Sequence, residues 1–238
     1  EKASDVLAAN TMVDWIKSKY GEDSIVWHKV ILPLEDGLKR IPEVIQALET
    51  YDTTTIRAST PMYLISEYIA KNTDVKVVLS GEGADELFGG YMYFKYAPND
   101  VAFRAEIVTL LQNLYLYDVL RADRSTAAHG LEVRPPFLDD LLVDVVLSNK
   151  NLKGSKTTTK ELIRLTVADK NLLPDNILWG KKEAFSDAVG LSWKESIEPY
   201  AHLELCKIDD KLYLTSIGKD LDWRNQKICH IRQYTREA

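Results

Sequence analysis

The chain has 238 residues, of which 45% are hydrophobic and 28% are charged, and its formal net charge is −6. This ordinary globular composition suits one large domain or two small ones. The acidic balance disfavours nucleic acid as the main partner, and the absence of an apolar run of about eighteen residues predicts no membrane span. Cys206 and Cys229 lack metal-site spacing and indicate free thiols in a reducing cytoplasm, although a disulfide between them stays open.

The first part of the chain alternates helical and strand-like patterns. Apolar residues at helical spacing predict helices over residues 4–19 and 36–50. Between them, residues 25–32 are rich in β-forming side chains and predict a strand. Thr60 followed by Pro61 has the form of an N-cap and a first helical position, which predicts a further helix from there. This order of elements indicates part of a parallel sheet covered by helices.

The most informative stretch comes next, where residues 75–93 read VKVVLSGEGADELFGGYMY. The apolar run at residues 77–79 suits a strand that is buried on both faces of a parallel sheet. In open α/β sheets, ligands bind just beyond the carboxyl ends of such strands. Gly81 and Gly83 would let the backbone approach a ligand closely.

Glu82, Asp85 and Glu86 place carboxylates in this turn, which has no P-loop lysine. A carboxylate about 4 Å from a phosphate oxygen would be repelled by roughly 4 kcal/mol at an effective dielectric constant of about 20. Magnesium reverses that sign, because it is held by one or two carboxylates together with substrate phosphates. We therefore predict that Asp85 holds Mg²⁺ and that Glu82 serves the substrate or proton transfer. An acidic surface turn is the alternative.

Helical patterns dominate the second part of the chain. Residues 101–120 and 141–147 are largely apolar and predict two helices. Thr158 and Glu161 have capping-box spacing before a third predicted helix at residues 160–169. Strand signals are scarce, so we expect a helical region packed on the sheet.

Four segments resemble the asparagine synthetases, which are glutamine-dependent, ATP-using amidotransferases. SGEGADELFGGYMYF resembles the SGEGSDE segment of that family. The other three occur in the family's order: ETYDTTTIRASTPMYL from Glu49, LRADRSTAAHGLEVRPPFLD from Leu120, and WGKKEAFSDAVG from Trp179. The resemblance covers the chain from about Glu49 to Trp193, and its four long matches in order are far more specific than one short motif.

The resemblance implies an α/β fold, with a partial parallel sheet of the adenine-nucleotide α-hydrolase (PP-loop ATP pyrophosphatase) type followed by a mainly helical region. Residues 1–96 would be the nucleotide-binding portion and residues 97–238 the helical portion of one C-terminal synthetase domain. The family's N-terminal glutaminase domain and SGGxDS loop have no match here, so we expect an internal fragment that is inactive alone. Residues 201–238 match poorly and receive no role beyond packing.

The resemblance also implies a ligase reaction. Aspartate would be converted to asparagine through β-aspartyl-AMP, with ATP as a substrate, Mg²⁺ as the metal, and AMP and pyrophosphate as products. Ammonia would come from a glutaminase domain not in this chain, although the nitrogen donor and a homodimer both stay open. Two alternatives remain: a related β-lactam-synthetase-like adenylating amide ligase, and a non-catalytic relative that acts as a binding module.

Roles for the turn and for the last motif follow from the resemblance. Ser80, Gly81 and Glu82 would lie along the nucleotide. Glu82 would also accept a proton from ammonia or hold the aspartate amine, two roles that the sequence does not separate. Lys182 would stabilise the charge that grows on the α-phosphate, whereas a solvated charge run is the alternative reading.

The resemblance makes Thr54, Thr55 and Arg57 substrate-contacting residues, since a guanidinium offers a fork for phosphate or carboxylate. Asp139 is placed near the aspartate substrate, although its simplest role is to cap the helix that follows it.

Three further features of the last two motifs carry expectations. The charged residues from Arg121 to Arg124 indicate a structural ion-pair network, and His129 is expected to be packed rather than a ligand. The chain departs from the family at Pro135, where Val is usual, and at Gly180, where Arg is usual. Pro135 alters the local path of its loop, and Gly180 removes a charge from this corner of the site.

Overall fold

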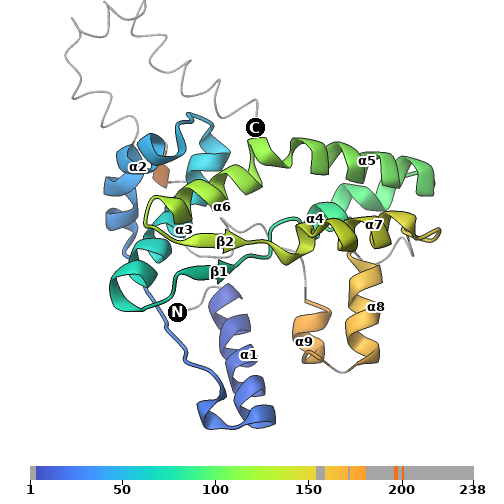
Figure 1. Ribbon diagram of the computed structural model, residues 1–238, viewed down its shortest axis with the longest axis horizontal. Coiled ribbons are helices and arrows are strands. Elements are labelled where there is room, and N and C mark those ends of the chain that lie inside the picture. Colours follow the sequence, from blue (N-terminus) through green and yellow to red (C-terminus); the bar gives the residue numbers. More distant parts are fainter. Residues whose placement is uncertain (1–3, 154–158, 171, 181–195, 198–199, 201–238) are drawn as a thin grey trace, which may run out of the picture.

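The computed structural model shows a mostly helical α/β arrangement around a small parallel sheet (Figure 1). It describes residues 4–153, 159–170, 172–180, 196–197 and 200. The longer helices are α1 (Ser4–Tyr20), α2 (Leu34–Leu48), α3 (Thr53–Asn72), α5 (Asp100–Asn113), α6 (Asp118–Ala127), α7 (Asp140–Ser148) and α8 (Glu161–Asp169). The shorter ones are α4 (Ala84–Leu87), α9 (Asp175–Leu178), and the 3-10 turns η1 (Glu22–Ser24), η2 (Met92–Tyr96), η3 (Leu114–Leu116) and η4 (Pro136–Leu138).

Two parallel strands, β1 (Val77–Leu79) and β2 (Glu132–Arg134), form the sheet within the described residues. Val78 lies opposite Val133, and the Ser80 amide extends the ladder by donating to the Arg134 carbonyl at 3.0 Å. The predicted strand at residues 77–79 and its parallel pairing are confirmed. The prediction that this strand is buried on both faces is wrong, because Leu79 is 76% exposed.

Two apolar clusters hold the helices in place. In the first, α2 and α3 bury Ile41, Val44, Leu48, Ile56 and Tyr63, and α3 packs along α6. The second lies under the glycine-rich turn, where α4 and α5 bury Leu87, Phe88, Phe94, Phe103 and Ile107 together with Val146 and Leu152. Burial of such side chains contributes on the order of 1.5–3 kcal/mol each. The second cluster anchors the residues that directly follow the turn after β1.

The helices predicted over residues 4–19 and 36–50 are confirmed, but two other predictions for the first half are wrong. Residues 25–32 are extended without ladder pairing, and Val26 is 80% exposed. A β-rich segment becomes a strand only where a neighbouring strand supplies hydrogen bonds. Helix α3 begins at Thr53 with Asp52 as its N-cap, so Pro61 lies inside the helix. Thr60 is buried, and its hydroxyl donates to the Ile56 carbonyl at 2.9 Å instead of capping.

In the second half, the helix at residues 141–147 is confirmed as α7, but the helix predicted over residues 101–120 is divided. Helix α5 ends at Asn113, η3 follows, and α6 starts at Asp118. The break comes at Tyr117, whose backbone angles, φ −128° and ψ −92°, are not helical. The predicted helix at residues 160–169 is confirmed as α8, with Lys160 in the N-cap position. Thr158 of the predicted capping box lies outside the described residues. Strand β2 lies in the portion expected to be helical.

Among the described ranges, no helix combines the length and the apolar character that crossing a membrane requires. The division into a nucleotide-binding portion and a helical portion near residue 96 stays a prediction. Strand β1 comes before that boundary and β2 after it.

Candidate active site

The chain turns sharply where β1 ends, which is where ligands bind in parallel sheets. Ser80 and Gly81 follow the strand, and Gly83 takes φ 88° as the N-cap of α4. The Ser80 hydroxyl accepts a hydrogen bond from the Glu82 amide at 3.2 Å. A Cβ on Gly83 would overlap the Leu138 side chain, so η4 packs directly on the turn. The turn therefore requires glycine for both its backbone angle and its packing.

Glu82 is mostly buried and is held by a cation from α6. Its carboxylate accepts from Arg121 Nη2, at 3.1 Å to Oε1 and 3.3 Å to Oε2. The side chains are 18% and 15% exposed, and Arg121 also pairs with Asp118. Burial raises the pKa of Glu82, Arg121 opposes the rise, and the negative charge of Asp118 adds to it. The carboxylate therefore holds a proton more strongly than an exposed glutamate does.

Asp85, the predicted metal ligand, forms an ion pair with Lys160, the residue before α8. Lys160 Nζ lies 3.0 Å from Asp85 Oδ2, and the side chains are 24% and 19% exposed. Gly90 lies directly against this pair, because a Cβ there would overlap Asp85 Oδ1 and meet Lys160 Cε. Its amide donates to the Asp85 carbonyl at 2.6 Å. The Asp85 carboxylate is thus turned toward the protein and neutralised by a lysine.

The third carboxylate of the turn, Glu86, is only 3% exposed. It accepts a hydrogen bond from the Tyr91 hydroxyl. Burial is the main cause that raises the pKa of Glu86, and it also raises the pKa of Tyr91. This pair lies in the aromatic cluster under the turn, where the Tyr91 hydroxyl supplies the hydrogen bond that a buried acid needs.

The three substrate-contacting residues predicted around Thr54 lie in the first turns of α3. Asp52 caps that helix by accepting from the Thr55 amide at 2.6 Å. Thr55 is 3% exposed, whereas Thr54 and Arg57 are partly exposed. Because α3 packs along α6, and α6 supplies Arg121 to Glu82, α6 connects this helix start to the turn.

Asp139 caps α7, as the simplest reading of the sequence predicts. Its Oδ1 accepts from the amides of Leu141 and Leu142 at 3.1 and 3.2 Å. It directly follows η4, whose Leu138 packs on Gly83. The structure thus brings Asp139 to the segment that contacts the turn, while its carboxylate already serves the helix.

A cavity of about 340 Å³ opens beside Glu82. Its lining includes Val119 and Ala122 of α6, Val133 of β2, and Pro135. Apolar side chains therefore form most of the lining, and its charged groups are Glu82, Asp123 and Arg124. Such a mixture of apolar wall and few polar groups is common in small-molecule sites.

The remaining sequence predictions divide into two groups. Lys182 lies outside the described residues, and its role stays a prediction. Arg121 and Arg124 do form ion pairs, with Glu82 and with Glu49. His129 is packed, as expected, with its ring centroid 4.3 Å from that of Tyr63.

Lys160 and Arg164 are site residues that the sequence analysis missed. Lys160 pairs with Asp85, and Arg164 donates to the carbonyls of Leu178 and Gly180 at the end of α9. Their sequence pattern resembles an ordinary helix start, so no local signal distinguishes them. The sequence identifies Glu86 as an acid of the motif, but it does not predict its burial, which depends on packing against Tyr91 and α5.

Comparison with known proteins agrees with these motifs. The chain matches the asparagine synthase family over residues 1–107 and 96–208. It is 46% identical over 224 residues to asparagine synthetase [glutamine-hydrolyzing] of Cricetulus griseus and 45% identical over 224 residues to that of Homo sapiens, each covering 92% of this chain. It is 46% identical over 217 residues to the protein of Gallus gallus, covering 89% of this chain.

The chain spans about 38% of the length of the curated relatives that it matches. The matched region includes the glycine-rich turn, the start of α3 and the segment that carries Arg121, all of which the structure describes. On these matches, the chain belongs to the asparagine synthase family.

Proposed function

We propose that this chain is part of a ligase that makes asparagine from aspartate, ATP and ammonia through β-aspartyl-AMP. The observation that carries the proposal is the position of Glu82, a buried carboxylate at the carboxyl end of β1, paired with Arg121 and lining the 340 Å³ cavity. The name of the relatives, asparagine synthetase, supports asparagine as the product.

In the first step, a side-chain carboxylate oxygen of aspartate attacks the α-phosphorus of ATP, and the bond to pyrophosphate breaks. The protein mainly has to position the two anions and neutralise charge. Ser80 and Gly81 would run along the nucleotide, because they directly follow β1. Thr54, Thr55 and Arg57 would contact substrate anions from the start of α3, where Thr54 and Arg57 are partly exposed.

Mg²⁺ would reduce the charge on the pyrophosphate when bound. Asp85 would hold it, which requires Lys160 to share that carboxylate with the ion. Glu82 and Glu86, the other acids of the turn, are held by Arg121 and by Tyr91. The described residues contain no group of three or more His, Cys, Asp or Glu side chains suited to a metal ion. This donor set fits an ion held by one carboxylate and substrate phosphates, as is usual for magnesium.

In the second step, ammonia attacks the carbonyl carbon of β-aspartyl-AMP, the carbon–oxygen bond breaks, and AMP leaves with the electron pair. The nitrogen must lose one proton as the amide forms. Glu82 would accept it, because burial raises its pKa and makes its carboxylate a stronger base than an exposed one. Holding the aspartate amine is the second role open to Glu82.

Isotope transfer tests the adenylation directly. The protein, expressed from its full reading frame, is incubated with ATP, ammonia and aspartate that carries ¹⁸O in its side-chain carboxylate. The proposed route puts one ¹⁸O atom into AMP and leaves pyrophosphate unlabelled. Label in inorganic phosphate with ADP as product would refute it.

Two other outcomes identify the alternatives. Amide formation within a single substrate, without added ammonia, would identify a β-lactam-synthetase-like ligase. Nucleotide binding without release of AMP would identify a binding module.

A further inference from the structure

Helix α8 connects two parts of the candidate site that are far apart in the sequence. Figure 1 shows α8 beside α9. Lys160, at the start of α8, pairs with Asp85 of the turn. Arg164, one helical turn further on, contacts the end of α9.

Arg164 makes an unusually complete set of backbone contacts. Its Nε donates to the Thr159 carbonyl at 2.9 Å and its Nη2 to the Gly180 carbonyl at 3.0 Å, while its Nη1 donates to the Leu178 carbonyl. The last carbonyls of a helix lack intrahelical partners, and a cation there is favourable. The planar fork of arginine can satisfy several carbonyls at once, which a lysine cannot do. Arg164 therefore fixes the end of α9, from which the sequence continues to Lys182.

Lys160 occupies a backbone conformation that favours glycine. Its φ is 56° and its ψ is 31°, in the left-handed region. A residue with a Cβ is strained in this conformation. Strain of this kind persists where the surroundings require the side chain, and here the side chain neutralises Asp85.

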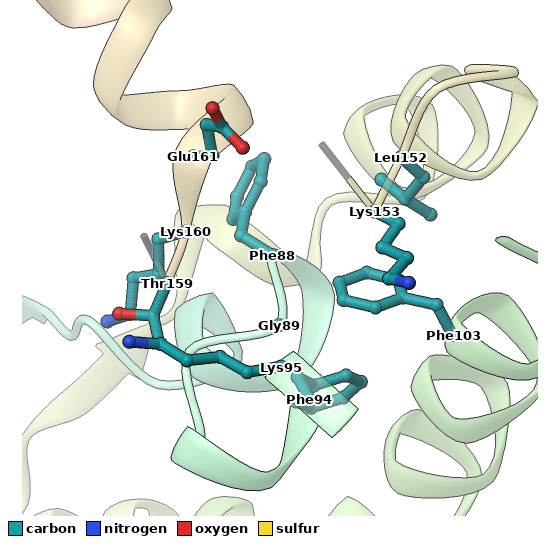
Figure 2. Close-up of a pocket in the computed structure, with 10 residues that line it drawn as sticks. All are labelled: Phe88, Gly89, Phe94, Lys95, Phe103, Leu152, Lys153, Thr159, Lys160 and Glu161. Carbon is teal, nitrogen blue, oxygen red and sulfur yellow. The ribbon is translucent and has the colours of Figure 1, made fainter. Parts of the chain in front are cut away.

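The junction between α8 and the turn is closely packed. Figure 2 shows Lys160 and Thr159 on one side of Phe88, with Leu152 on the other. The cavity that these residues surround measures about 10 Å³, barely enough for one water molecule. Gly90 lets the backbone lie against the Asp85–Lys160 pair, since any Cβ would overlap it. The first turn of α8 is thus seated firmly on the acidic turn.

We infer that α8 is a brace and that Lys160 and Arg164 are positioning residues, which hold the Asp85 carboxylate and the end of α9 in fixed places. The inference rests on the proposed function for its effect on catalysis, but the brace itself is a property of the fold. Because misplacement by about 1 Å can reduce a rate about a hundredfold, loss of either contact would lower kcat more than it raises KM.

The test uses Arg164→Met in the protein expressed from its full reading frame, with Arg104→Met as the matched control. Arg104 also donates to a backbone carbonyl, that of Asn149 at 2.8 Å, but this contact joins α5 to the end of α7 and involves neither α8 nor α9. Hydrogen exchange over residues 172–180 should become faster in Arg164→Met and stay unchanged in Arg104→Met. Aspartate-dependent pyrophosphate release should lose roughly ten- to a hundredfold in kcat, with KM values within about threefold. Arg164→Lys, which keeps the charge, should recover part of the loss.

Lys160→Met is tested in two backgrounds. If Lys160 acts through Asp85, the variant lowers kcat in the native protein but adds no further loss in an Asp85→Asn background. An equal loss in both backgrounds, or unchanged exchange over residues 172–180 in Arg164→Met, would overturn the brace. A native protein that forms no AMP would remove the proposed function and the catalytic part of this inference, and hydrogen exchange would then still decide whether α8 braces α9.

Discussion

Arg121 reaches from α6 to the carboxylate of Glu82, with Nη2 3.1 Å from Oε1 and 3.3 Å from Oε2. The contact joins the helix after η3 to the turn after β1. Both side chains are more than four-fifths buried, and Asp118 pairs with the same guanidinium. Arg121 therefore neutralises two acids, one of which, Glu82, lines the cavity. Glu82 depends on this arginine to be buried as a carboxylate.

Arg121→Met should destabilise the fold strongly. It leaves two mostly buried carboxylates without their cation, a change that typically costs about 3–5 kcal/mol. Urea unfolding measures the loss. Arg134→Met is the matched control, because the Arg134–Glu132 pair is 62% and 60% exposed and should contribute at most about 1 kcal/mol. Adding Glu82→Gln to Arg121→Met should restore part of the stability, and a fully additive double variant would contradict the coupling.

The rate of amide formation should depend on the ionisation of Glu82. Because burial raises the pKa of Glu82, its carboxylate stays protonated, and cannot act as a base, up to a higher pH than an exposed glutamate. The rate at saturating ammonia should therefore rise as the pH increases through that raised pKa. Glu82→Gln should remove the acidic limb together with most of the activity. An unchanged acidic limb in that variant would rule out Glu82 as the base.

Glu86 should make the fold less stable as the pH rises. Its folded-state pKa is raised, so the folded protein binds the proton more tightly than the unfolded chain does. The protonated Glu86 side chain contributes its full stabilisation to the fold below the pKa that it has in the unfolded chain, about 4.3. This contribution is lost as the pH rises through the higher pKa of Glu86 in the folded protein. Glu86→Gln, which still accepts from Tyr91, should flatten this slope in urea unfolding measured at a series of pH values. A slope as steep as that of the native protein would contradict the assignment.

Asp139 can be tested as a cap and as a substrate contact separately. Asparagine is as good an N-cap as aspartate, so Asp139→Asn should leave the melting temperature nearly unchanged. Asp139→Ala should lose about 1 kcal/mol, because the Leu141 and Leu142 amides lose their acceptor. If the carboxylate also serves the substrate, Asp139→Asn raises KM for aspartate. An unchanged KM would leave Asp139 as a helix cap alone.

Gly83→Ala should be costly for two separable reasons. Its φ of 88° strains any residue with a Cβ by roughly 1–2 kcal/mol, and that Cβ would also overlap Leu138. Gly130→Ala is the control for the first cause, because Gly130 has φ 72° and open space around it. The difference between the two variants in thermal unfolding reports the overlap with η4. A Leu138→Ala background should reduce that difference, and a difference that persists would place the strain elsewhere.

Local sequence signals predicted the elements that depend on local chemistry. Asp139 was recognised as a cap, since a carboxylate before an apolar run can reach the first amides of a helix without help from the rest of the chain. Residues 25–32 show the opposite case, because a strand needs a partner that periodicity does not supply. At α3, the sequence predicts a start at Thr60, whereas the helix begins at Thr53 with Asp52 as its N-cap.

The sequence by itself determined the family, the turn after β1 and its three acids, because these are contiguous residues whose chemistry is visible in order. Only the tertiary structure decided which partner each acid meets: the Arg121 guanidinium for Glu82, the Lys160 ammonium for Asp85, and the Tyr91 hydroxyl for Glu86. The two cations are distant along the chain and are brought in by α6 and α8. Electrostatic partners depend on distances in space and on exclusion of water, and neither can be calculated from residue order alone.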